Sequence, residues 1–435
     1  MDPFYSIKEM VSQLLAKLFD NGKSLIPSDR KSIFLTLFVA IFTTVTGVGI
    51  VVPLLPVYAN DLGATGIYVG MIFGSFSISR TVLLPVFGRM SDQKGRKPFI
   101  VTGLSVYTLV SIAFIFSKNI ETLILLRFVQ GAGSAMVLPV VQAYVGEITP
   151  RGSEGYSMGL FNLSMFLSLS LGPLMGGVIK DIWSLEAAFM GMGVLSGIGL
   201  LLCIFLLPAT AKETVKTRKK DIVPWSNLVT DKGIISIFIF RYAYTSCIGV
   251  IWCFLPLFAD IEFGLSGSLT GILVMLGVFV SGILQLPMGY VADRMNKNIM
   301  ILLGGILSSI GILMPYWSSN FQDLVIAVSI FGIGGGISMP AIMAHAVKKG
   351  NTKKAMGSVM SIITVAHSLG MLTGSMAAGF TMDYLSLRVS FPCGALIMAL
   401  GTLFFCILSR KNGKNGDRKN GDRPRFWKNG DRPRF

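Results

Sequence analysis

Long apolar segments recur along almost the whole chain and limit what it can fold into. About twelve stretches of roughly 18 or more mostly apolar residues are present, and each is long enough to cross a bilayer core of about 30 Å as a helix. Of the 435 residues, 52% are hydrophobic and 14% are charged, whereas soluble proteins carry about a quarter charged residues. We therefore predict an all-helical membrane protein with spans near 32–59, 66–87, 98–117, 120–146, 154–180, 187–208, 233–260, 266–290, 298–317, 321–347, 354–383 and 387–409.

Basic residues are concentrated in alternate loops. The formal net charge is +16, and strong basic charge is also typical of nucleic-acid-binding proteins. Here the basic residues fall in every second loop and in the stretch 209–232, whereas the other loops carry acidic residues such as Asp181 and Asp383. Basic loops stay on the cytoplasmic side of a membrane. The pattern therefore predicts a multi-pass protein of the cell (inner) membrane with both termini cytoplasmic, in contact with lipid headgroups and without a nucleic-acid partner.

An internal repeat divides the chain into two halves. Small residues and prolines recur at a nearly constant offset of 198 to 201 residues, which is 201 (332 − 131) in the pairs Gly131 and Gly332, Gly133 and Gly334, and Pro139 and Pro340. Such a repeat predicts two six-helix bundles related by an axis along the membrane normal, with the ligand site between them near the midplane.

The predicted organisation has five parts. The stretch 1–31 is a cytoplasmic leader that either forms a short amphipathic helix in the membrane interface or is loosely ordered. The bundles occupy 32–208 and 233–409, and the basic stretch 209–232 is the cytoplasmic linker between them. From 410 to 435 the repeated Asn-Gly-Asp and Arg-Pro steps favour turns, so we expect a flexible basic tail.

A short basic turn lies between the predicted helices at 66–87 and 98–117. It reads Gly88-Arg-Met-Ser-Asp92-Gln-Lys-Gly95-Arg96-Lys97, and a weaker copy that contains Asp293 begins 201 residues later (289 − 88). This pattern resembles the signature loop of the major facilitator superfamily of membrane transporters. The resemblance covers about residues 30 to 409 and implies alternating access between two rigid halves. A basic loop that only sets topology is the alternative.

The resemblance also implies roles for residues of this loop. Gly88 and Gly95 permit a tight turn. Asp92 is expected to face the N-terminus of the predicted helix at 354–383, where the helix dipole favours a carboxylate. Arg96 is expected to meet Glu147. In the superfamily such contacts hold the halves together on the cytoplasmic side while the cavity opens outward. The expected cytoplasmic gate therefore comprises Gly88, Asp92, Gly95, Arg96, Lys97, Glu147 and Asp293.

Two further motifs resemble elements of the drug/proton antiporters in that superfamily. The segment Gly172-Pro173-Leu-Met-Gly176-Gly177 matches their Gly-Pro-x-x-Gly-Gly element, and the second half lacks the corresponding proline. Arg127-Phe-Val-Gln-Gly matches their Arg-x-x-Gln-Gly element, whose arginine is tied to proton coupling or substrate charge. The chain thus resembles the twelve-helix drug/proton antiporter branch, which implies export rather than uptake.

Charged residues inside the predicted spans are candidates for function, because a membrane-embedded arginine costs at least about 2.5 kcal/mol. Arg127 and Arg241 each either act on a proton or substrate charge or extend to the membrane interface. For Arg80 we expect extension to the cytoplasmic interface. Every Asp and Glu lies in a loop or at a helix end, which puts proton coupling through an acid of the first helix in doubt. His367 remains as a mid-helix titratable group, either for coupling or for hydrogen bonding in the helix packing.

Polar, aromatic and methionine side chains inside the spans are candidates for the substrate cavity. A mostly apolar lining with adaptable methionines suits lipophilic cargo. The candidates are Gln142, Asn162, Tyr244, Trp252, Gln285, Met339 and Met343.

The residues together favour a secondary transporter that exports small amphiphilic compounds, with protons as the coupling ion and a monomer as the unit. An organic-anion or metabolite carrier of the same fold, with Arg241 and Arg127 as anion ligands, is the first alternative. A transporter-like sensor that signals through its basic tail is the second. We find no nucleophile–base pair, phosphate loop, metal spacing or disulfide framework, so we predict neither an enzyme nor a metal or cofactor.

Overall fold

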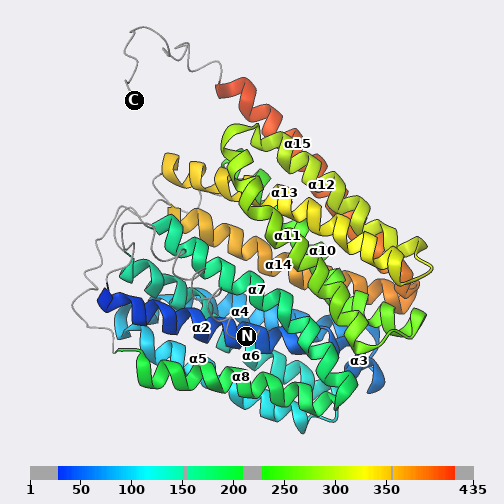
Figure 1. Ribbon diagram of the computed structural model, residues 1–435. Helices are drawn as coiled ribbons and strands as arrows, with labels where there is room; N and C mark the ends of the chain where they lie inside the picture. The colour runs from blue at the N-terminus through cyan, green and yellow to red at the C-terminus, as the bar shows by residue number, and fades with distance from the viewer. Residues whose placement is uncertain (1–27, 150–153, 209–227, 229, 354–355, 417–435) are drawn as a thin grey trace, which may run out of the picture.

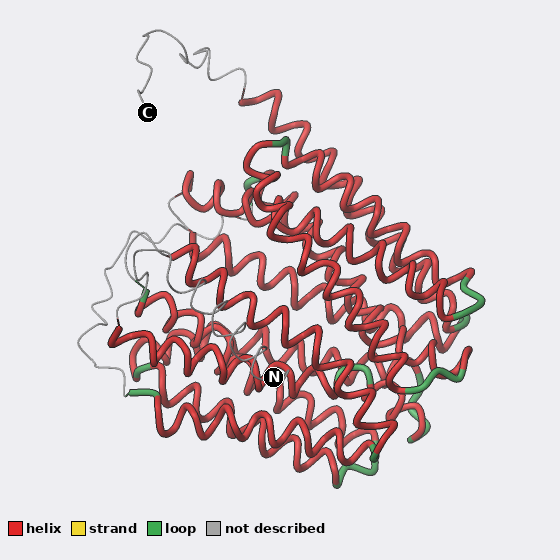
Figure 2. The backbone as a smooth tube through the Cα atoms, in the orientation of Figure 1, coloured by secondary structure: helices red, strands yellow, loops and turns green. Residues whose placement is uncertain are grey.

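The computed structural model describes residues 28–149, 154–208, 228, 230–353 and 356–416. Every regular element in those ranges is a helix, as Figure 2 shows in red. Twelve spans within them are long and apolar enough to cross a membrane. The predicted all-helical fold class is therefore confirmed.

Helices of the first half account for its six spans. Their bounds are α2 Ser28–Val51, α3 Leu54–Asp61, α4 Gly66–Lys94, α5 Arg96–Ile115, α6 Ile120–Ile148, α7 Glu154–Ile182 and α8 Leu185–Leu206. The first predicted span, 32–59, is divided between α2 and α3. Pro53 lies at this break. Proline has no backbone N–H, so the pattern of helical hydrogen bonds is interrupted there.

The second half follows the same order. Its elements are α10 Lys232–Phe263, α11 Gly267–Arg294, α12 Lys297–Leu313, the 3-10 helix η2 Met314–Trp317, α13 Phe321–Lys353, α14 Met356–Tyr384, the 3-10 helix η3 Leu387–Val389 and α15 Ser390–Gly416. The first residues of the expected tail from 410 are helical, since α15 continues to Gly416. Lysine and arginine favour helix more than asparagine and glycine do. The leader up to residue 27, nearly all of the linker and the tail from 417 lie outside the described residues.

Two helix pairs provide most of the packing between the halves, and α10 also contacts α3 and α4. In Figure 1 the helices coloured blue to green form the lower part of the molecule, and those coloured green to red form the upper part. Between them, α4 packs against α14 and α7 packs against α11. The interface therefore consists mainly of antiparallel helix pairs, each with one member from each half.

The halves meet at the end of the bundle away from the first and last described residues, here called the distal side. A Cβ atom on Gly70 would lie 2.6 Å from the carbonyl oxygen of Ser375, and the Cβ of a residue at Gly177 would overlap the carbonyl of Gly267. Only glycine permits such an approach of two backbones. At the opposite end, the termini side, no atom of the described residues lies within 4 Å of a Cβ added to Gly88 of α4 or to Gly289 of α11. The halves are thus joined on the distal side and separate toward the termini side.

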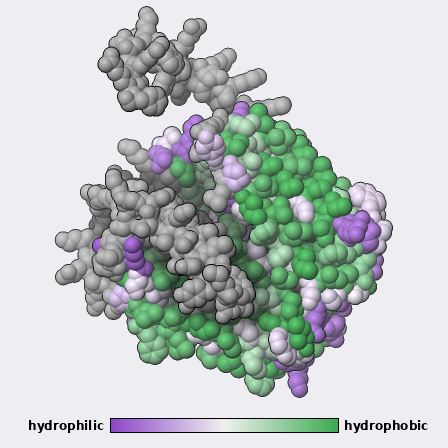
Figure 3. Space-filling model, viewed as in Figure 1, coloured by the Kyte–Doolittle hydropathy of each residue, from purple (hydrophilic) through white to green (hydrophobic). Residues whose placement is uncertain are grey.

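Apolar side chains cover much of the outer surface. Large hydrophobic residues such as Phe205, Phe116 and Leu109 are exposed, and hydrophilic residues gather near the two ends of the visible face (Figure 3). A soluble monomer rarely exposes so much continuous apolar area. The chain is an integral, multi-pass membrane protein.

Candidate functional site

Arg127 is buried in the packing of the first half. Its Nη1 donates to Oε1 of Gln130 at 2.7 Å, and its Nε donates to the carbonyl oxygen of Ile72 at 3.4 Å. The guanidinium also lies over the rings of Phe73 and Phe76, with 4.9 and 4.6 Å to the centroids. The side chain is only 4% exposed. Extension to the outer surface is therefore the wrong interpretation for Arg127, which links α6 to α4.

Arg241 and His367 meet in the second half. Nη1 of Arg241 donates to the sulfur of Met339 at 2.6 Å, and its Nη2 lies 3.3 Å from Nδ1 of His367. Because arginine only donates hydrogen bonds, the histidine nitrogen is the acceptor. Arg241 follows the start of α10 at Lys232 by nine residues (241 − 232), which is about 14 Å at 1.5 Å per residue. These side chains therefore lie well inside the helix bundle.

Arg80 occupies the middle of α4, at equal separation from Gly66 and Lys94. Its Nε is buried and has no hydrogen-bond partner among the described residues. The expected extension to the interface is therefore not what the structure shows, because the guanidinium group faces the interior of the bundle.

The basic loop on the termini side makes contacts within the first half. Arg96 donates to Oε1 of Glu147 from Nε at 3.1 Å and from Nη2 at 2.7 Å, and its Nη1 donates to the hydroxyl of Ser91 at 2.6 Å. Lys97 donates to the carbonyl oxygens of Ile204 at 2.8 Å and Leu207 at 2.5 Å. A cation there satisfies the free carbonyls at the end of α8. The loop thus fixes α4, α5, α6 and α8 to one another.

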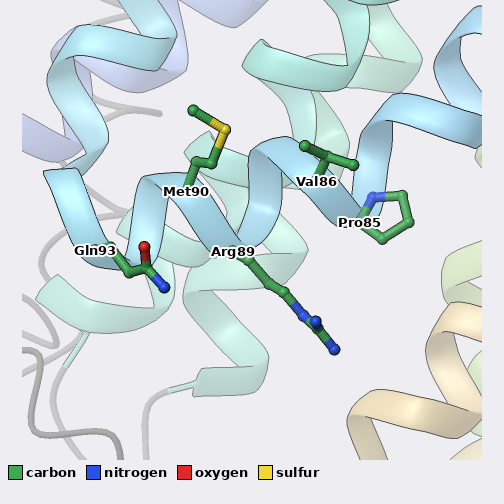
Figure 4. A pocket seen from close by; sticks show the side chains of 5 residues that line it. All are labelled: Pro85, Val86, Arg89, Met90 and Gln93. Carbon is green, nitrogen blue, oxygen red and sulfur yellow. The ribbon is translucent and has the colours of Figure 1, made fainter.

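Gly95 adopts a backbone conformation that favours glycine, with φ at 91°. The side chains of Asp92 and Asp293 lie outside the described residues, so their expected gate contacts stay predictions. Just before the loop, α4 borders a cavity of about 330 Å³. Arg89 extends from the helix beside it (Figure 4). The cavity is lined by Pro85, Val86, Arg89, Met90 and Gln93.

Two carboxylates that the sequence marks only as loop acids connect the halves on the distal side. Asp181, at the end of α7, accepts from the backbone N–H of Gly267 at 2.9 Å and of Ser268 at 2.7 Å. Asp383, at the end of α14, accepts from Gly66 at 2.5 Å and from Ile67 at 2.9 Å. Each carboxylate caps the first turn of a helix in the other half, where the helix dipole favours negative charge. The signal that could have found them is their spacing of 202 residues (383 − 181), which is within one residue of the 201-residue spacing of the internal repeat.

The glycine motif of α7 packs that helix between α2 and α11. A Cβ atom on Gly172 would lie 2.6 Å from the carbonyl oxygen of Thr46, and one on Gly176 would overlap the carbonyl of Ile50. Gly177 approaches Gly267, and the carbonyl of Pro173 lies against Gly271. The motif therefore lies at the junction of the two halves, one turn from Asp181.

The predicted cavity residues are spread over both halves. Tyr244 is buried, and its ring stacks on Phe331 with centroids 5.3 Å apart. Met339 contacts Arg241, as described above. The side chain of Asn162 lies outside the described residues, and a lining role for the remaining candidates stays a prediction. These are Gln142, Trp252 and Gln285, which are half-buried, and Met343, which is exposed.

Comparison with known proteins gives matches along nearly the whole chain. The profile of the Major Facilitator Superfamily matches residues 37–261 and 243–432. An uncharacterised MFS-type transporter of Methanocaldococcus jannaschii is 28% identical over 386 residues, which cover 88% of this chain and 99% of that protein. Multidrug resistance protein 2 of Bacillus subtilis is 23% identical, with 86% and 94% covered. Among solved structures, a bacterial homologue of the human lysosomal transporter Spinster, in an inward-facing, unoccupied conformation, aligns with a TM-score of 0.76 at 12% identity and covers 89% of this chain and 98% of that one.

Proposed function

Because the chain belongs to the Major Facilitator Superfamily of membrane transporters, we propose that it exports small amphiphilic compounds by alternating access with proton antiport. A transporter rather than an enzyme follows from the family itself. Export is supported by relatives that are named multidrug resistance proteins, among them those of Bacillus subtilis. The glycine motif at Gly172 to Gly177 adds support from this chain's own residues.

The distribution of charge supports an orientation. Basic residues dominate the loops on the termini side, so that side faces the cytoplasm of a cell that carries the protein in its inner membrane. In the described conformation the two halves are then in contact on the outer side of the membrane and apart on the cytoplasmic side. Compounds enter the space between the halves from the cytoplasm or the inner leaflet, as an exporter requires.

The observation that carries the proposal is the asymmetry between the two ends of the interface. Glycine contacts and the carboxylates of Asp181 and Asp383 hold the halves together on the distal side. Rocking of rigid halves around a midplane site would exchange this closure for one on the cytoplasmic side. In that second state we assign the gate to the loop around Asp92, with Gly88, Gly95, Arg96, Lys97, Glu147 and Asp293.

Proton coupling is assigned to the interior of the second half. The carboxylates of the described residues lie at helix ends, as the pair of Arg96 and Glu147 illustrates. His367 is a titratable group inside a membrane span that contacts a charged neighbour, Arg241. Its protonation would change the charge of the substrate space, and this supplies a link between proton and substrate. We propose that the working unit is a monomer.

Proton movement in proteoliposomes tests this function. The full chain is reconstituted, a pH gradient is imposed, and cationic, neutral and anionic amphiphiles are added in turn while an internal pH dye is followed. Export by proton antiport predicts proton flux only after a transported compound is added. Substrate movement that ignores the gradient would exclude the coupling, and no movement of any compound would exclude the export.

A further inference from the structure

Helix packing brings Arg80 opposite His367. The helices α4 and α14 are antiparallel, so residue numbers rise along α4 while they fall along the facing side of α14. The successive contacts are Gly66 with Gly379, Gly70 with Ser375 and Gly74 with Leu372. Continuing this antiparallel register by six residues beyond Gly74 reaches Arg80 on α4 and the turn around His367 on α14. The two helices belong to different halves.

Arg241 completes the group from a third helix. Contacts of α10 with α14 run in parallel, with Ser246 beside Gly374 and Tyr242 beside Gly370. This register leads to the measured contact between Arg241 and His367, at 3.3 Å. Three potentially cationic side chains, from α4, α10 and α14, therefore gather at one depth between the halves.

Hydrogen-bonding capacity remains unused in this group. Within the described part of the chain, Nε of Arg80 and Nε of Arg241 are both buried without a hydrogen-bond partner. Arg127 differs, because its Nε donates to the carbonyl oxygen of Ile72, its Nη1 donates to Gln130, and two aromatic rings lie against its guanidinium group. Leaving a buried charged donor unsatisfied is costly, so an acceptor that arrives with a ligand would be strongly favoured at Arg80 and Arg241.

The described residues offer no counter-charge at this depth. Each Asp and Glu within the described ranges lies in a loop or near a helix end, so none of these carboxylates accompanies the arginines in the middle of the spans. A guanidinium fork fits a planar carboxylate through two parallel hydrogen bonds. The parts of α4, α10 and α14 on either side of the group are mostly apolar, and they would accommodate the body of an amphiphile.

We infer that Arg80, Arg241 and His367 form a binding site, shared between the two halves, for the anionic head of an amphiphilic organic acid. This inference rests on the proposed function, because it names the charge of the compounds that the transporter carries. Since Arg80 belongs to the first half and the other two residues to the second, a bound carboxylate draws the halves together on the termini side. Substrate binding would thus favour the conformational exchange that export requires.

A matched pair of fluorescent probes tests the site directly. The purified full chain in lipid nanodiscs is titrated with 11-(dansylamino)undecanoic acid and with its methyl ester, which differ only in the charged head. We expect the acid to bind at least about tenfold more tightly than the ester, the factor typical of one hydrogen bond to a charged group. Equal affinity of the two probes for the wild type would overturn the inference.

Variants assign the preference to the site. Arg80→Gln and Arg241→Gln are each expected to reduce the preference for the acid to about threefold or less, with the affinity for the ester unchanged. Lys118→Gln removes one positive charge from an exposed distal loop and is expected to keep the wild-type preference. Arg80→Lys and Arg241→Lys keep the charge but lose the fork, so they are expected to give intermediate values. A full preference for the acid in both glutamine variants, or in both lysine variants should the glutamine variants not fold, would overturn the inference.

Transport separates this inference from the proposed function. If the proteoliposomes export neutral or cationic amphiphiles while the acid and ester bind equally, only the anion site is wrong. If the acid is preferred and the arginine variants remove that preference, but no compound moves, the site stands and export is wrong.

Discussion

At the scale of single residues, Asp231 is a carboxylate on the termini side with four contacts to described donors. It accepts from the backbone N–H of Gly233 at 2.8 Å and of Ile234 at 3.1 Å at the start of α10. Lys349 and Lys353 of α13 lie 2.8 and 3.3 Å from its oxygens. Burial raises the pKa of this carboxyl. The two ammonium groups and the N–H donors lower the pKa by more than burial raises it, so the pKa lies below its ordinary value of 3.8.

This direction of the shift predicts how stability depends on pH. A carboxyl whose pKa is depressed in the folded state contributes stability that is present above its unfolded pKa and lost as pH falls through the folded value. The contribution of Asp231 is therefore complete near neutral pH and declines below about pH 4. We expect Asp231→Ala to lose about 1 kcal/mol at pH 7, the typical value of a helix cap. Asp231→Asn should lose less, because asparagine also caps helices.

Thermal unfolding in detergent, followed by intrinsic fluorescence at pH 7 and at pH 3, measures this effect. The wild type is expected to lose more thermal stability between the two pH values than Asp231→Asn does. Equal losses in both proteins would show that the ion pairs of Asp231 contribute nothing to the pH dependence.

At the scale of elements, the distal closure depends on two reciprocal helix caps. The carboxylates of Asp181 and Asp383 each bind the first turn of a helix in the other half. A cap of this kind is worth about 1 kcal/mol. Replacing both residues with alanine should therefore weaken the closed distal side by about 2 kcal/mol, and this is about a thirtyfold shift of population toward distal opening.

Spin labels on the distal loops measure that shift. Labels at Lys118→Cys and Ser319→Cys, one in each half, report the distance between the halves by double electron–electron resonance when the native cysteines are replaced by alanine. The double alanine variant should populate a longer distance than the parent, and Asp181→Asn with Asp383→Asn should fall between them. An unchanged distance distribution would contradict a role for the caps in closure.

The contact between Gly177 and Gly267 lies in the same interface, so an added methyl group there also tests whether the closed distal side depends on close packing. A Cβ on Gly177 would lie 2.5 Å from the carbonyl carbon of Gly267 and 2.8 Å from the N of Ser268, both backbone atoms that cannot move aside cheaply. At Gly191, by contrast, the nearest atom to an added Cβ is the Cδ1 of Ile179 at 3.5 Å, an ordinary contact. We expect Gly177→Ala to separate α7 from α11.

The same pair of spin labels distinguishes these two variants. Gly177→Ala should lengthen the distance between the halves on the distal side, whereas Gly191→Ala should leave the distribution as in the parent. A similar response in both variants would mean that helix propensity, not backbone contact, controls the effect.

At the scale of the whole molecule, the two ends of the interface are expected to close in alternation. Asp92 belongs to the end that is separated in the described conformation, so its proposed contact with the start of α14 forms only in the other state. We expect Asp92→Asn to insert normally but to export at least about tenfold more slowly, since loss of about 1.4 kcal/mol from that state shifts its population tenfold.

Export measured in the proteoliposome assay, with the amount of inserted protein determined in parallel, checks this expectation. Arg89→Gln serves as the comparison, because it removes a charge on the same exposed stretch of α4. Export by Asp92→Asn at the wild-type rate would rule out the gate.

Most of the fold could be predicted from the sequence. Length and apolarity of the segments specify helices that span a bilayer, because lipid offers no partner for an unpaired backbone group. The nearly constant spacing between repeated residues specifies two similar halves. The recurring loop at Gly88 to Lys97 specifies the superfamily. Each of these signals can be read along the chain alone, so it needs no knowledge of which residues lie beside one another in space.

The candidate site depended on the tertiary structure. The sequence marks Arg80 and Arg127 alike as arginines within a span, but only packing shows that Gln130 and two aromatic rings satisfy Arg127 while a donor of Arg80 remains free within the described chain. Likewise Asp181 and Asp383 are ordinary loop acids until the helices of the opposite half are placed against them. The environment of a buried or capping charge is set by residues that can be far away in the chain, as for Asp383 and Gly66, which are 317 positions apart. The sequence by itself therefore determined the spans, the repeat and the family, and the tertiary structure decided which charges are free and which end of the interface is closed.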